Sequence, residues 1–117
     1  MRKIEAKSKT PEILIDESGS EIKLKGILVP ENPTEFFNIL NTEITDIYNK
    51  NQKLSLSFQL EYFNTGAAKY LYEMFKMLKG HNNLKIIWLY DADDEDIYES
   101  GIQFQELSEI CFEFQEI

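Results

Sequence analysis

The sequence is poor in the residues that most metal proteins and many enzymes use at their active sites. It has one cysteine, Cys111, and one histidine, His81, in 117 residues. A lone cysteine cannot form an internal disulfide, and this pair is too small a set for a zinc cluster or a Cys–His dyad with ordinary partners. Neither a GxGxxG nor a Walker phosphate-binding motif occurs. We therefore expect a protein with no cofactor and no catalytic activity.

Basic residues are also scarce. Lys and Arg number 12 against 21 Asp and Glu, which gives a formal net charge of −9. Nucleic-acid binding usually requires a basic surface, and an anionic membrane surface would repel this chain, so neither is an expected partner. A protein with a basic face would be attracted, although the same charge also serves solubility alone.

Long apolar runs are missing as well. None approaches the ~20 residues that cross a bilayer, and the first five residues lack the apolar core of a signal peptide. Together with the single cysteine, these absences predict a cytoplasmic protein. Hydrophobic residues still make up 43% of the chain, which is enough for one core, so we expect one domain over residues 1–117 that is a monomer when free.

Two hydrophobic periods alternate along the chain. Strands are predicted at 12–16, 22–28, 54–60, 84–90 and 110–114, the first two as a hairpin and the fourth as an apolar run. Helical periodicity predicts helices at about 33–50, 66–79 and 94–108, the last with Ile97, Gly101, Phe104 and Leu107 facing inward. This order predicts an α/β fold with a mixed sheet. Because the strands at 22–28, 54–60 and 110–114 alternate rather than running apolar throughout, the helices should pack mainly on one face.

The junction at residues 60–69 is the first candidate functional site. Thr65 lies where a strand gives way to a helix, and a phosphate there would meet unpaired N–H donors at the positive end of the helix dipole. Gly66 and the alanines after it leave room for a phosphate or a partner surface. The structural alternative is that Asn64 or Thr65 simply caps the helix.

The acidic run Asp91–Asp96 is the second candidate. It begins like a calcium-binding loop, but Asp96 stands where that loop requires glycine and Ile102 where it requires glutamate. The same acids complement the dipole at the start of a helix, and they also suit docking to a basic partner. Cys111 alternates with inward-facing neighbours and is expected to pack rather than react.

Several separated segments together resemble the SiaC-like family of small bacterial regulatory phosphoproteins, which is similar to the STAS-domain anti-anti-sigma factors. The resemblance covers nearly the whole chain. The matching segments are Thr10–Ile13, Pro30–Asn32, Leu60–Thr65 with Lys69, Trp88, Tyr90, Asp93–Asp96, Glu99 and Gly101.

This resemblance implies a single STAS-like domain and a phosphorylation-controlled binding protein with Thr65 as the phosphoacceptor. It also implies a cognate anti-sigma-type Ser/Thr kinase, a phosphatase and, for some members, a diguanylate cyclase as effector, which points to biofilm regulation. In this family the unmodified form usually binds the effector and the phosphorylated form releases it. The partner-binding residues carried over are Tyr62, Asn64, Gly66, Lys69, Asp93, Asp94 and Glu95.

The sequence departs from the family immediately after the threonine. The family commonly has two serines there, whereas this chain has Gly66 and Ala67, which leaves Thr65 and Tyr62 as the hydroxyls of the junction. Two alternatives stay open at this point: a constitutive adaptor that is never phosphorylated, and a divalent-metal-binding protein that uses Asp91–Asp96.

Overall fold

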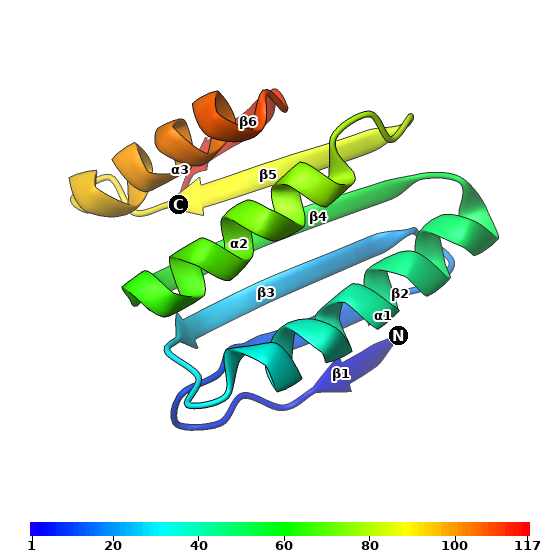
Figure 1. Cartoon of the computed structure of the whole chain (residues 1–117), viewed down its shortest axis with the longest axis horizontal. Coiled ribbons are helices and arrows are strands. Elements are labelled where there is room, and N and C mark those ends of the chain that lie inside the picture. Colours follow the sequence, from blue (N-terminus) through cyan, green and yellow to red (C-terminus); the bar gives the residue numbers. More distant parts are fainter.

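The chain folds into six strands and three helices (Figure 1). The computed structural model describes all 117 residues. In chain order the elements are β1 (Arg2–Ile4), β2 (Glu12–Asp16), β3 (Glu21–Leu28), α1 (Pro33–Asn51), β4 (Leu54–Phe63), α2 (Thr65–Leu78), β5 (Leu84–Tyr90), α3 (Glu95–Ser108) and β6 (Phe112–Glu116). None of the helices is long and apolar enough to cross a membrane.

All six strands form one mixed sheet in the order in which they occur along the chain. β1, β2 and β3 pair antiparallel, and β3 to β6 pair parallel. The predicted hairpin and the parallel second half are therefore confirmed. β1 was not predicted, because it has three residues and only one of them, Ile4, is apolar. Its start is held by Arg2, whose guanidinium lies 2.9 Å from Glu17 and 2.8 Å from Glu43 of α1.

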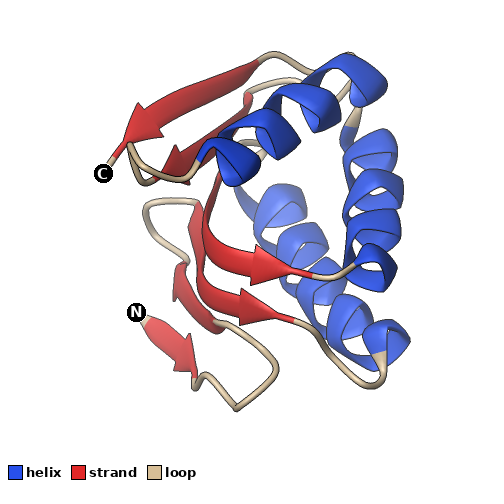
Figure 2. Cartoon of the chain, turned by 90° about the vertical axis from the view of Figure 1, so that its left-hand side faces the viewer, coloured by secondary structure: helices blue, strands red, loops and turns tan.

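The three helices cover one face of the sheet and leave the other uncovered (Figure 2), as predicted. The side chains of β4 alternate accordingly. Leu56 and Phe58 are fully buried against the helices, whereas Ser57 and Gln59 point to the open face and are half-buried. α1 and α2 likewise turn their apolar stripes inward. The main stabilising contribution to the fold is the burial of these apolar side chains between the helices and one face of the sheet.

Trp88 organises the half of the core beneath α3. Its side chain is 1% exposed, its ring lies 5.7 Å from Phe58 and 5.7 Å from Phe104, and its indole N–H donates to the carbonyl of Ile97 at 2.9 Å. Gly101 permits this contact, because a Cβ there would lie 2.5 Å from the indole ring. The Trp88 ring therefore fixes the position of α3 on the sheet.

Three sequence-based predictions near the C-terminus were wrong. Leu107 is 60% exposed, and Ser108 occupies the inward position instead, because the buried stripe advances by four, three and four residues from Ile97. The last strand begins at Phe112, since Glu109 ends α3 in the left-handed conformation and the chain must first turn back. Cys111 lies in this connection and is exposed rather than packed.

Candidate functional site

The loops that lead into the three helices lie along one edge of the sheet, at the carboxyl ends of its parallel strands (Figure 1). The junction between β4 and α2 is central among them. One backbone hydrogen bond joins it to the end of β3, where the Asn64 N–H donates to the carbonyl of Leu28. A second, from the Val29 N–H to the carbonyl of Lys9, joins the connection after β3 to the loop before β2. Ligands and partners of α/β proteins commonly bind at this edge.

Asn64, and not Thr65, caps α2. The Asn64 side-chain oxygen accepts a hydrogen bond from the Ala67 N–H at 2.8 Å. Thr65 is the first helical residue, it is exposed, and its hydroxyl makes no hydrogen bond within the protein. The hydroxyl is thus free of the structural role that the sequence left open for it.

The start of α2 also carries no acidic residue in its first turn, unlike the starts of α1 and α3. Lys69 lies one turn further along α2, is exposed, and takes part in no ion pair. A Cβ added to Gly66 would meet only the Asn64 side-chain oxygen, at 3.7 Å. The positive end of this helix dipole is therefore open to an added negative charge.

The two residues that follow Thr65 have different surroundings. Gly66 is exposed, whereas Ala67 is fully buried against the core. A serine at position 67 would have to bury its hydroxyl beneath α2. A serine at position 66 would therefore change the surface, and one at position 67 would change the interior.

An exposed apolar pair adjoins this junction on the open face of the sheet. Tyr62 is 58% exposed and pairs across the sheet with Ile27, which is 39% exposed. Sequence reasoning missed Ile27, because the register of β3 shifts between Gly26 and Ile27 and no alternation pattern reveals that irregularity. Gly26 accommodates the shift with a φ of 131°.

The three acidic residues carried over from the family lie on the neighbouring loop. Asp94 is the N-cap of α3, accepting from the Ile97 N–H at 3.1 Å, and Glu95 lies in the first turn. Asp93 is exposed beside them. They share the sheet edge with Thr65. No group of three or more His, Cys, Asp or Glu side chains is placed to hold a metal ion.

A second hydroxyl at this edge was also missed. The Thr34 hydroxyl, in the first turn of α1, lies 2.7 Å from the hydroxyl of Tyr70 in α2. The Tyr70 ring stacks on Phe37 with centroids 5.3 Å apart. This contact joins α1 to α2. Of Thr34 and Thr65, only Thr65 therefore has a hydroxyl without a hydrogen-bond partner in the protein.

Three solved structures from Pseudomonas aeruginosa share the fold, each with 24% sequence identity. A chain in the crystal structure of diguanylate cyclase SiaD in complex with its activator SiaC aligns over 100% of both chains with a TM-score of 0.88. Apo-SiaC gives 0.82 over 98% of this chain and 99% of that one, and a further SiaC structure gives 0.79 over 98% and 97%. No curated protein matches the sequence. The sequence matches the SiaC family of regulatory phosphoproteins over residues 4–117, and the chain belongs to that family.

Proposed function

We propose that this protein is a non-catalytic binding partner of a diguanylate cyclase and that phosphorylation of Thr65 switches its docking off. A Ser/Thr kinase of the anti-sigma type adds the phosphate, and a phosphatase removes it. The relative SiaC is the activator of the cyclase SiaD and is found in complex with it. The proposal transfers that class of partner to this chain.

The free Thr65 hydroxyl is the observation that carries the proposal. It is exposed at the start of a helix that lacks acidic residues in its first turn, and Asn64 already caps that helix. A phosphate there would add about −1.5 to −2 charges beside unpaired backbone N–H groups. The helix therefore accepts the modification without unfolding, so that the effect falls on the partner.

The docking surface in this proposal is the sheet edge around Thr65. Tyr62 supplies an exposed ring next to the junction, and Gly66 and Lys69 continue the surface onto α2. Asp93 and Glu95 extend it toward α3 and favour a partner with basic side chains. A phosphate in the middle of this surface raises its desolvation cost and repels acidic groups of the partner, so the complex dissociates.

Phosphopeptide mapping tests the site. Wild-type protein incubated with the kinase, ATP and Mg²⁺ should gain one phosphate on the peptide that contains Thr65, and Thr65→Ala should gain none. Thr34→Ala is the matched control, since Thr34 also lies in the first turn of a helix at this edge. Undiminished labelling of the Thr65→Ala variant would rule out Thr65 as the acceptor.

Binding to the cyclase separates the switch from constitutive docking. We expect Thr65→Glu to bind the cyclase at least about tenfold more weakly than Thr65→Gln, which has nearly the same shape without the charge. Equal binding by the two variants would favour the constitutive adaptor instead.

A further inference from the structure

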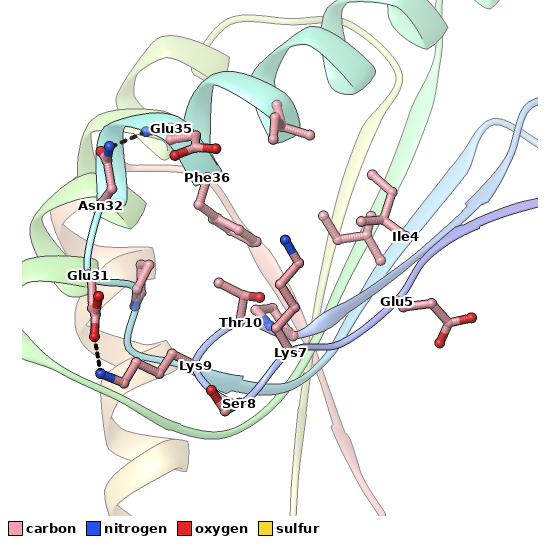
Figure 3. Close-up of a pocket in the computed structure, with 14 residues that line it drawn as sticks. Ile4, Glu5, Lys7, Ser8, Lys9, Thr10, Glu31, Asn32, Glu35 and Phe36 are labelled. Atoms are coloured by element: carbon pink, nitrogen blue, oxygen red, sulfur yellow. Dashed lines mark hydrogen bonds and ion pairs between the residues drawn. The ribbon is translucent and has the colours of Figure 1, made fainter.

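A cavity of about 400 Å³ lies between the loop that follows β1 and the start of α1 (Figure 3). Its apolar wall is formed by Ile4, Pro11, Ile13, Phe36 and Ile39. Phe36 and Ile13 belong to the core, whereas Ile39 is 45% exposed on α1 at the mouth. Small-molecule sites typically have roughly 300–1,000 Å³ of space, mainly apolar walls and a few polar groups.

The loop that forms the other wall is fixed by backbone hydrogen bonds. Lys7 N–H donates to the carbonyl of Thr10 at 3.1 Å, and Val29 N–H donates to the carbonyl of Lys9 at 2.8 Å. The side chains of Lys9 and Glu31 form an ion pair across the rim. The cavity is therefore built by the fold itself and does not depend on a bound molecule.

Lys7, an exposed residue of this loop, is the cation of the lining that remains unpaired. Figure 3 shows the Lys7 ammonium reaching into the cavity between Phe36 and Ile4, and it takes part in no hydrogen bond or ion pair. The Thr10 hydroxyl beside it has no hydrogen-bond partner either. Of the rim acids, Glu31 is paired with Lys9, and Glu5 lies 3.8 Å from Lys3.

We propose that this cavity binds a small amphiphilic monocarboxylate, with a short aliphatic chain against Phe36 and Ile39 and its carboxylate on Lys7. One ammonium and one hydroxyl donor match the two oxygens of a carboxylate. Glu35, on the α1 wall, forms no ion pair and disfavours a second negative charge. The aliphatic chain covers apolar surface that is otherwise exposed to water.

Titration with sodium octanoate tests the proposal, with 1-octanol as the uncharged probe of equal chain length. In ¹H–¹⁵N spectra we expect saturable shifts of the amides of Lys7, Thr10 and Phe36 with octanoate. Octanol should bind about fivefold more weakly, because it lacks the charge-assisted hydrogen bond. Equal affinity for the two probes, or shifts confined to other parts of the protein, would overturn the proposal.

Exposed side chains supply the variants, so each should fold. Lys7→Met should weaken octanoate binding about fivefold and leave octanol binding unchanged, and Glu35→Gln should strengthen octanoate binding. Lys50→Met is the matched control, since Lys50 lies near the other end of α1, outside the cavity. Octanoate affinity unchanged in Lys7→Met would contradict the assignment. Because Lys7 lies outside α2, phosphorylation of Thr65 should not change in that variant, and the two proposals can fail separately.

Discussion

Two strand-to-helix junctions at the same edge of the sheet differ in the negative charge that they place at the start of the helix. At β5–α3, Asp94 caps the helix and Glu95 and Asp96 place two carboxylates in the first turn. At β4–α2, the neutral Asn64 caps the helix and the first turn holds no acid. Carboxylates near a helix start stabilise it by about 0.3–1 kcal/mol each. Glu95 and Asp96 already supply this stabilisation at the start of α3, whereas at the start of α2 a phosphate on Thr65 could supply it.

The same contrast extends to the charge of the whole chain. Every Lys and Arg of the sequence lies at or before Lys85, so the segment that contains α3 and β6 carries acidic charges only. The rest of the chain is nearly balanced. A phosphate on Thr65 therefore adds negative charge to the balanced part of the sequence, at the same sheet edge as the acidic loop before α3.

The largest expected effect concerns the glycines of the two helices. Gly101→Ala should destabilise the protein by about 1–3 kcal/mol, because the new Cβ would lie 2.5 Å from the Trp88 ring, which is buried and cannot move freely. Gly66→Ala should instead stabilise it by about 0.4–1 kcal/mol, since a Cβ there meets only the Asn64 side chain, at 3.7 Å.

Urea unfolding monitored by tryptophan fluorescence measures both changes. Gly66→Ser is the control, because it adds a Cβ at the same exposed position together with a hydroxyl. A Gly101→Ala variant as stable as the wild type would mean that α3 can shift away from Trp88, contrary to the packing described above.

A smaller change in stability should follow from adding a carboxylate at the start of α2 and from removing one at the start of α3. We expect Thr65→Glu to be more stable than Thr65→Gln by about 0.3–1 kcal/mol, and Glu95→Gln to be less stable than the wild type by a similar amount. Both differences should shrink in ~1 M salt, where the Debye length is about 3 Å. If Thr65→Glu gained nothing over Thr65→Gln, the start of α2 would not be an open site for negative charge.

Most of the fold could be predicted from the sequence because the hydrophobic pattern is consistent along each element. Leu54, Leu56 and Phe58 alternate with polar residues and are buried, and so are the apolar residues that recur at helical spacing in α2. The errors occur where local pattern does not decide the structure. Arg2–Ile4 becomes a strand through pairing and ion pairs with distant residues, and Leu107 turns outward because Trp88 sets the rotation of α3.

The candidate site was predictable only in part. The position of Thr65 at a helix start follows from the pattern, whereas the choice of Asn64 as the cap depends on a side-chain geometry that both residues could have supplied. Two other features of the site are contacts between residues far apart in the sequence, namely the pairing of Ile27 with Tyr62 and the contact of Thr34 with Tyr70. Such pairings arise from topology, which the order of elements alone left open.

The smallest expected effect tests how the two helices are joined at their far ends. Lys79, just after α2, lies 2.7 Å from Glu109, just after α3, and the hydrogen bond and charge of Lys79 lower the pKa of Glu109. A carboxyl whose pKa is lower in the folded than in the unfolded state adds stability above the ordinary glutamate pKa of about 4.3. That contribution is lost as the pH falls through the folded-state pKa.

Glu109→Gln should therefore reduce the loss of stability between about pH 6 and pH 3. The matched control is Glu106→Gln, an exposed glutamate of α3 that forms no ion pair. The measurement is the urea midpoint of the three proteins across this range. Because both groups of the pair are exposed and screened by solvent, the difference should be small and should fall further with added salt. Identical pH dependence in the two variants would show that the contact between Lys79 and Glu109 does not persist in solution, and that α2 and α3 are held together by their apolar faces alone.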